Sequence, residues 1–254
     1  MEGVDMSSMP LLKALAKAGI GPRRQLADAI RQGRVEVNRK VVEDFRYPLN
    51  VETDRISIDK RPVDLKPRQA VYFLLNKPKG VLSTTSDERG RRTVLDMLPE
   101  NHRHLRLYPV GRLDKESTGL LLLTNDGELT HRLTHPSFEH EKEYLVSINA
   151  RLRASEKRRL EQGLKLEDGI THRAIVKEVQ AKPFNYSITI HEGRKRQVHR
   201  MFEYLGHRIL ALKRVRMGNI QLGDLRDGEI RELSEQEVQA LLIDGTEHAK
   251  STSP

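Results

Sequence analysis

A proline flanked by two basic residues interrupts the chain in the segment Asp64-Leu65-Lys66-Pro67-Arg68. Polar segments that contain proline are typical of linkers. The 254 residues also exceed one domain of typical length, which is roughly 150 residues. We therefore expect a small domain over residues 9–65 and a larger one over 70–241, with flexible tails at 1–8 and 245–254.

The residues before this linker predict a small unit of two helices and short strands. Proline at the start and glycine at the end delimit helices over residues 10–19 and 22–32. Alternating apolar residues predict strands over 35–37 and 55–59. Arginines lie on the second of the two helices.

The residues after the linker mix strands and helices without regular alternation. Strands are expected over 70–75, 119–124, 142–149 and 185–191, and helices over 155–161 and 197–205. A turn is expected over 76–80, and Ser234 with Glu237 forms a capping box that opens a final helix. This order does not fit a doubly wound parallel sheet, so we expect an α+β fold whose mostly antiparallel, mixed sheet is flanked by helices.

The charge balance and the residue types exclude several classes of protein. The chain has 45 Lys and Arg against 36 Asp and Glu, a net charge of +9, which favours a polyanionic partner such as nucleic acid over a merely basic surface. It has no cysteine, so disulfides, thiolate metal sites and cysteine nucleophiles are excluded. The longest apolar run, 120–123, is far too short to span a membrane, and residues 1–10 do not resemble a secretory signal. We expect a soluble, cytoplasmic protein.

A polar loop with three charged residues lies directly before the most apolar segment. The loop carries Arg112, Asp114 and Glu116, and the segment is the run 120–123. One interpretation is a charged surface turn. The other is that a rigid, buried strand holds Asp114 at its mouth as a nucleophile or base, with Arg112 beside it.

Positive charge is concentrated over residues 191–216, which contain eight Lys and Arg against two Glu. A solvated helix start would explain the cluster, but arginines at the positive end of a helix dipole favour an anion-binding site. Histidines recur here every eight residues, at 191, 199 and 207, and we interpret them as separate hydrogen-bonding groups rather than metal ligands. No glycine-rich nucleotide-binding motif is present.

Four segments together resemble the ribosomal RNA pseudouridine synthases of the RsuA/RluB branch. They are Asn76-Lys77-Pro78-Lys79-Gly80-Val81-Leu82-Ser83-Thr84, the block from Gly111-Arg112-Leu113-Asp114 to Asp126-Gly127, Glu141-Lys142-Glu143-Tyr144, and Glu192-Gly193-Arg194-Lys195-Arg196-Gln197-Val198. The N-terminal unit resembles the α-L RNA-binding motif that this branch carries before its catalytic domain. The resemblance extends from residue 10 to about 241.

The resemblance implies an enzyme that isomerises a uridine to pseudouridine without a metal or an organic cofactor. Asp114 matches the catalytic aspartate, which attacks the ribose C1′ of a flipped-out uridine. Tyr144 matches the tyrosine that stacks on the target base, and Arg112 matches an arginine that contacts RNA. We expect the partner to be ribosomal RNA or a pre-ribosomal particle, and the protein to be a monomer.

The chain departs from the family where His199 replaces an arginine that is expected near the catalytic carboxylate. A neutral histidine stabilises the charge of Asp114 less, so Arg196 or Arg200 could take over. Pro10 and Pro22 also replace residues that are often arginine and serine. We expect catalytic roles for Asp114, Tyr144, Arg196 and His199, and RNA contacts from Arg112, Arg23, Arg24, Arg31, Arg34, Lys77, Arg194, Lys195 and Arg200.

The motifs leave the target open. The stretches Leu166-Glu167-Asp168-Gly169 and His135-Pro136-Ser137 favour the 23S type over the 16S type. A non-catalytic RNA-binding factor for ribosome assembly on the same scaffold is the alternative function. Asp114 argues against this alternative, because phosphate binding gains nothing from a carboxylate in the pocket.

Overall fold

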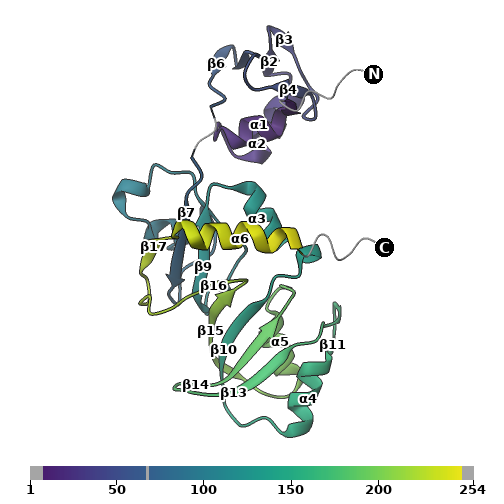
Figure 1. Ribbon diagram of the computed structural model, residues 1–254, viewed down its shortest axis with the longest axis vertical. Helices are drawn as coiled ribbons and strands as arrows, with labels where there is room; N and C mark the ends of the chain where they lie inside the picture. Colours follow the sequence, from purple (N-terminus) through teal and green to yellow (C-terminus); the bar gives the residue numbers. More distant parts are fainter. Residues whose placement is uncertain (1–7, 67–68, 248–254) are drawn as a thin grey trace. The chain divides into compact units, whose positions relative to one another are not determined.

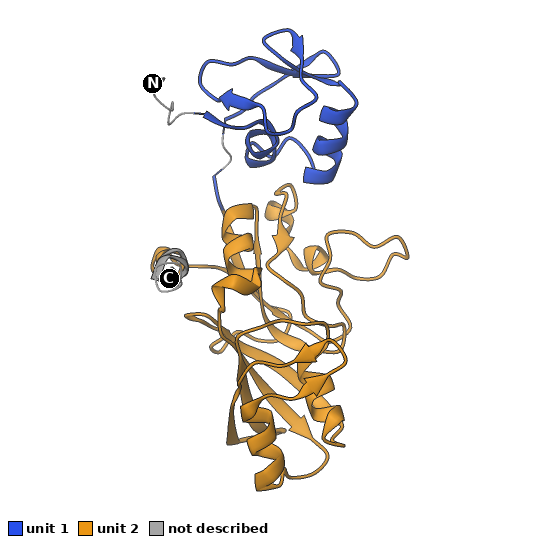
Figure 2. Ribbon diagram, turned by 90° about the vertical axis from the view of Figure 1, so that its right-hand side faces the viewer, with its two compact units in different colours: residues 1–70 blue, residues 71–254 orange. Residues whose placement is uncertain are grey.

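The computed structural model describes residues 8–66 and 69–247, and the chain divides into two compact units, residues 1–70 and 71–254 (Figure 2). Ser8 pairs with Asn50, and residues 245–247 continue the last helix, so these residues are not tails as expected. The rest of the expected tails lies outside the described residues.

The first unit packs two helices against short antiparallel strands (Figure 1). Its elements are β1 (Ser8–Pro10), α1 (Leu11–Lys17), α2 (Arg23–Arg31), β2 (Val35–Val37), β3 (Lys40–Val41), β4 (Pro48–Asn50), β5 (Ile56–Ile58) and β6 (Arg61–Val63). The strands pair in the order β3-β2-β5-β6, with β1 paired to β4. Gly19 and Gly33 follow the helices with φ values of 68° and 66°, a conformation that glycine adopts without strain. Leu11, Leu15 and Ile30 are fully buried in the core of this unit.

The second unit is built on a nine-stranded sheet with the order β13-β14-β10-β15-β9-β7-β17, to which β16 and β8 attach at β15 and β9. Its strands are β7 (Tyr72–Lys77), β8 (Tyr108–Pro109), β9 (Thr118–Thr124), β10 (Lys142–Ile148), β13 (Ile175–Ala181), β14 (Phe184–Ile190), β15 (Ile209–Met217), β16 (Ile220–Gln221) and β17 (Ile230–Glu232). Every pair is antiparallel except β15 with β9. The expected α+β fold with a mostly antiparallel, mixed sheet is therefore confirmed.

Helices and short connections surround this sheet (Figure 1). They are η1 (Val94–Met97), η2 (Glu100–His102), α3 (Gly127–Thr134), η3 (Pro136–Phe138), α4 (Ala154–Gln162), α5 (Gln197–Tyr204) and α6 (Glu235–Glu247), together with the hairpin of β11 (Lys165–Leu166) and β12 (Gly169–Ile170). The capping box before α6 is present, because the amide of Ser234 donates to Glu237 at 2.9 Å and the amide of Glu237 donates back at 3.3 Å.

Each face of the sheet carries a hydrophobic core, because successive side chains of a strand point to opposite faces. Leu121 and Leu123 of β9 belong to the cluster that contains Tyr144, whereas Leu120 and Leu122 belong to a second cluster. Within the described part of the chain, no helix is both long enough and apolar enough to cross a membrane.

The parallel pair of β9 and β15 is the seam that joins the strands β13, β14, β10 and β15 to the strands β9, β7 and β17. Its register matches Thr118 with Lys213 and Gly119 with Arg214. Gly119 has a φ of +99°, and a Cβ atom at this position would overlap the backbone oxygen of Arg214. Glycine is required here because the two backbones approach each other so closely.

The turn expected at 76–80 begins later than the sequence indicates. Asn76 and Lys77 are fully buried in β7, where they pair with Leu120 and Gly119 of β9. The proline that follows Lys77 marks the end of the strand rather than the middle of a turn.

Candidate active site

Asp114 lies on the loop between β8 and β9, directly before the buried strand. Its side chain is about one-third exposed (34%), while its neighbour Leu113 is buried. No hydrogen bond to its carboxylate is found among residues 8–66 and 69–247. The carboxylate is thus held at a surface but is not used to stabilise the fold.

Two side chains fix the loop on either side of Asp114. Ser83 donates to the carbonyl of Leu113 at 2.9 Å and accepts from the amide of Leu113 at 3.2 Å. On the other side, the Nζ of Lys77 donates to the carbonyls of Ser117 at 2.8 Å, Lys115 at 3.3 Å and Pro78 at 3.1 Å. Because both flanks are bonded, the position of Asp114 is set by the β7–β9 part of the sheet.

The prediction that Lys77 contacts RNA is wrong for this structure. Its side chain is fully buried, and its amine is directed to the three loop carbonyls. Burial lowers the pKa of Lys77 to about 8, although the charges of Glu116 and Asp114 act in the opposite direction. Lys77 therefore holds the loop that carries Asp114 in place by hydrogen bonds to its backbone carbonyls.

His199 of α5 faces Asp114. Its Nδ1 lies 3.9 Å from a carboxylate oxygen of Asp114, which is beyond hydrogen-bond distance, and this nitrogen is buried without a partner among the described residues. Burial and the charge of Arg196 lower the pKa of His199, against the opposing effect of Asp114 and Glu203. At neutral pH the imidazole is therefore uncharged, and Asp114 has a polar but neutral neighbour.

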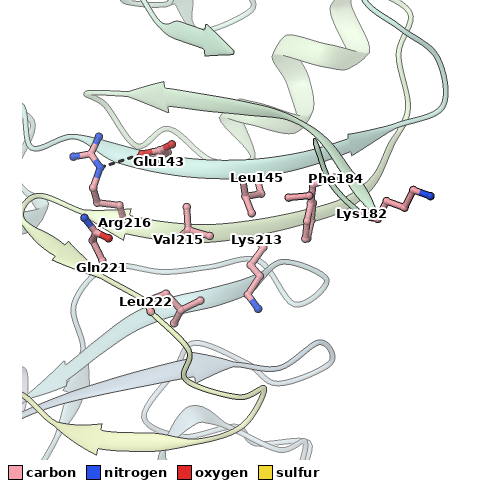
Figure 3. A pocket seen from close by; sticks show the side chains of 11 residues that line it. Glu143, Leu145, Lys182, Phe184, Lys213, Val215, Arg216, Gln221 and Leu222 are labelled. Carbon is pink, nitrogen blue, oxygen red and sulfur yellow. Dashed lines mark hydrogen bonds and ion pairs between the residues drawn. The ribbon is translucent and has the colours of Figure 1, made fainter. Parts of the chain in front are cut away.

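A small cavity of about 120 Å³ lies beside this pair, lined by His199, Glu116, Thr118 and Leu212, among others. A larger groove of about 570 Å³ lies elsewhere on the unit, where Leu145, Lys213 and Val215 contribute to its lining (Figure 3). Leu145 alternates with Tyr144 along β10, so the larger groove is on the opposite face of the sheet.

Two sequence models of known families match the chain. The sequence model of the RNA pseudouridylate synthase family matches residues 71–204, which include Asp114, Tyr144 and His199, and that of the S4 domain matches residues 9–64. The chain belongs to the RNA pseudouridylate synthase family.

Relatives of this synthase match it over nearly their whole length. It is 40% identical over 235 residues to ribosomal large subunit pseudouridine synthase B of Bacillus subtilis (strain 168), which covers 91% of this chain and 94% of the relative. It is 37% identical over 239 residues to an uncharacterized RNA pseudouridine synthase of Aquifex aeolicus (strain VF5), covering 93% and 94%. A crystal structure of a pseudouridylate synthase superposes with a TM-score of 0.66 at 32% identity, covering 92% of this chain and 100% of the other.

Tyr144 of the synthase lies on the face of the sheet that carries the Asp114 loop. It is 8% exposed and packs in the same core cluster as Leu113 and Val198, the chain neighbours of Asp114 and His199. The loop before β9 and helix α5 bring Asp114 and His199 to within 3.9 Å of each other, and strand β10 places Tyr144 in the core with their chain neighbours.

Arg196 does not lie where the sequence interpretation placed it. Its guanidinium pairs with Glu203 at 3.5 Å and is partly exposed, and it has no ion pair with Asp114. Arg196 adopts a left-handed conformation (φ 51°) as the residue before α5. Its charge still reaches the site, because it lowers the pKa of His199.

Arg194 and Arg200 are committed to contacts within the synthase, so the prediction that they contact RNA does not fit the structure. Arg194 donates to Glu192 at 2.8 Å, to the carbonyl of Asp168 at 3.2 Å and to that of Ile170 at 2.6 Å. Arg200 donates to Asp168 at 2.8 Å and holds the pKa of that carboxyl below its usual value. These contacts tie the β11–β12 hairpin to the start of the helix that carries His199.

Other predicted RNA contacts have charges that remain available. Arg112 and Lys195 are exposed, and so are Arg23 and Arg24 at the start of α2; none of these side chains has a hydrogen bond or an ion pair in the part of the chain that the structure describes. A further two arginines of the first unit are neutralised: Arg31 pairs with Asp28 at 2.9 Å, and Arg34 pairs with Asp59.

Lys195→Ala should weaken RNA binding and flatten its salt dependence, because the Lys195 side chain is exposed and has no partner among the described residues. Loss of one phosphate contact should reduce the log–log slope by roughly 0.7 to 0.9. Arg194→Ala is the matched comparison: it should lower the melting temperature and leave the slope unchanged. Titrations of RNA at several salt concentrations measure both. An equal change of slope in the two variants would contradict the assignment of Lys195 to RNA and of Arg194 to contacts within the protein.

His199→Arg should preserve or raise turnover at neutral pH. Arginine stays protonated and would place a permanent charge beside Asp114, whereas His199 is neutral there and gains its proton only as the pH falls. Because the pKa of His199 is lowered from the ordinary value of 6.5, the wild-type rate should change as the pH falls below that value, and the rate of the variant should vary less. Single-turnover rates across this range test the point. A large loss of activity in the variant would show that the site depends on histidine.

Proposed function

We propose that this synthase converts a specific uridine of large-subunit ribosomal RNA to pseudouridine, with Asp114 as its nucleophile. The observation that carries the proposal is the placement of Asp114. Its carboxylate is partly exposed, free of hydrogen bonds within the described chain, and mounted on a loop bonded on both flanks. The relative in Bacillus subtilis, whose name refers to the large ribosomal subunit, supports the choice of RNA.

The reaction can be written with this chain's own residues. The uridine flips out of its strand, because C1′ and C5 are not accessible in a stacked helix. The Asp114 carboxylate attacks C1′, the C1′–N1 bond breaks, and its electron pair leaves with the base. The base turns, C5 bonds to C1′ as the carboxylate is released, C5 loses its proton and N1 gains one. Nothing is oxidised or reduced overall, so the isomerisation requires no redox cofactor.

Tyr144 is proposed to stack on the target base, and Arg112 to contact the RNA strand as the base leaves it. Arg23 and Arg24 of the S4 domain, which are exposed and without a partner in the described chain, are proposed to bind phosphates outside the catalytic unit. We propose further that the enzyme acts as a monomer, in the cytoplasm where ribosomes are assembled.

The test is a map of pseudouridine across both ribosomal RNAs in a strain that lacks the gene. One position of the large-subunit RNA should lose its pseudouridine, and the wild-type gene should restore it. Loss of a position in the small-subunit RNA would reassign the target. A map without any change, together with a defect in ribosome assembly, would favour the non-catalytic alternative. Purified enzyme with protein-free RNA and with pre-ribosomal particles from that strain would show which is the substrate.

A further inference from the structure

An arginine is buried in the catalytic sheet without a carboxylate partner. Arg214 of β15 is 3% exposed, and the one hydrogen bond of its side chain within the described chain runs from Nε to the carbonyl of Leu120 at 2.8 Å. Its Nη2 is buried and has no partner among the described residues. Arginine keeps its proton in proteins, so this side chain places an uncompensated charge in the interior, where a charge is normally paired.

A second cation adds to this charge. Lys142 of β10 donates to the carbonyl of His140 at 3.0 Å and has no ion pair in the described part of the chain. Burial lowers the pKa of Lys142 to about 8, with a further contribution from the charge of Arg214. The charge of each residue thus raises the free-energy cost of burying the charge of the other. The two together favour the binding of a hydrogen-bond acceptor or an anion.

Arg216, on the same strand, is an arginine whose charge is fully paired within the fold. Arg216 donates to Glu141 at 2.8 Å, to Glu143 at 3.1 Å and to the carbonyl of Gly218 at 3.0 Å. Two carboxylates therefore neutralise Arg216, whereas the described chain supplies none to Arg214. Of these two arginines of β15, only Arg214 lacks a carboxylate partner among the described residues.

The strand register places Arg214 on the catalytic face of the sheet. Arg214 pairs with Tyr144, and Arg216 pairs with Glu143, with a register shift between the two pairs. Arg216, with Glu143, lines the groove on the far face (Figure 3). Arg214 shares its face with Tyr144, and its partner in β9 is Gly119, five residues after Asp114.

We propose that Arg214, with Lys142 behind it, donates a hydrogen bond to a carbonyl oxygen of the target uracil and stabilises the base as it detaches. Any heterolytic cleavage of the C1′–N1 bond leaves the electron pair on the base, whose negative charge spreads over N1 and the carbonyl oxygens. A fixed cation in a water-poor site stabilises charge that develops in the transition state. A backbone phosphate does not reach a side chain that is 3% exposed, whereas a flipped-out base enters the interior.

The inference rests on the proposed function, and its test separates the two. Arg214→Met and Arg214→Lys are compared with wild type on the mapped RNA, measuring the single-turnover rate, the RNA affinity and its salt dependence. Arg214→Met should slow the single turnover by about 10²- to 10³-fold, with little change in affinity or salt slope. The single-turnover rate of Arg214→Lys, which keeps the charge, should lie between the rates of the wild type and Arg214→Met. Arg216→Met is the control: it should lower the melting temperature while the single-turnover rate stays near that of wild type.

Other results would overturn the inference. An unchanged rate in Arg214→Met would do so, and so would weaker binding with a flatter salt slope at an unchanged rate, because that pattern denotes a phosphate contact. If Arg214→Met does not fold, Arg214→Lys is tested with 2-thiouridine and 4-thiouridine at the target, because sulfur is the poorer acceptor. At least one of the two thiouridines should slow the wild-type enzyme by a larger factor than it slows Arg214→Lys. Equal factors for the two enzymes would refute the contact. A wild type that forms no pseudouridine would instead refute the proposed function.

Discussion

Asp114→Asn should form no detectable pseudouridine while it folds and binds RNA nearly as the wild type does. The amide keeps the shape of the carboxylate but is a far poorer nucleophile, so the covalent step stops. Stability should hardly change, because the fold does not use this carboxylate: among the described residues, its one ionisable neighbour within 4 Å is His199, at 3.9 Å, whose imidazole is uncharged at neutral pH. The hydrogen bond from the Ser117 amide goes to the backbone oxygen of Asp114 and is kept in the variant.

The measurement is pseudouridine formed by the purified variant over many multiples of the wild-type reaction time, with RNA affinity and the melting temperature measured in parallel. Glu116→Gln is the matched control on the same loop. Glu116 is exposed and pairs with Lys79 at the surface, 3.2 Å apart, so this variant should remain active. Substantial turnover in Asp114→Asn would exclude Asp114 as the nucleophile.

Lys77→Met should lower both the free energy of unfolding and the turnover. Methionine fills much of the same volume but cannot donate to the carbonyls of Ser117, Pro78 and Lys115. A buried acceptor that loses its donor costs about 1–3 kcal/mol, so we expect a loss on the order of 2–4 kcal/mol, partly offset by removal of a buried charge. Turnover should fall as well, because the flank of Asp114 is released. Urea unfolding and single-turnover rates measure the two effects.

Lys79→Met is the control for stability, because Lys79 is exposed and its surface ion pair is worth less than about 1 kcal/mol. The pH adds a second test. The pKa of Lys77 is about 8 in the folded protein against 10.5 for an ordinary lysine. Between these values the unfolded chain binds the additional proton, so the contribution of Lys77 to stability rises with pH. The wild type should therefore gain stability relative to Lys77→Met from about pH 8 to 10.5. A constant difference would show that Lys77 titrates normally.

The sequence predicted the elements that carry the site better than the contacts of its charged side chains. The loop of Asp114 was recognisable because a polar segment precedes four consecutive leucines, and the structure places it directly before β9. The burial of Lys77 was not recognisable, because it depends on the pairing of β7 with a strand some forty residues away. A lysine beside a proline and a glycine has the composition of an exposed turn.

The basic stretch shows the same limit. A count of charges over 191–216 indicates an anion-binding surface, but it does not show which cations are already neutralised. Asp168, which takes up both Arg194 and Arg200, comes from a hairpin more than twenty residues earlier in the chain. The sequence signal for this contact was the Leu166-Glu167-Asp168-Gly169 turn, whose carboxylates have no local arginine or lysine within that turn.

The parallel seam between β9 and β15 determines when an active protein can exist during its synthesis. The Asp114 loop is made early, but the seam needs Lys213 and Arg214, about 95 residues after their partners Thr118 and Gly119. Pairing over such a separation closes a long loop and comes late in folding. The S4 domain is complete by residue 64, so we expect it to form on the ribosome well before the sheet that holds Asp114 can close. The nascent chain could engage RNA through that domain while it is still unable to modify it.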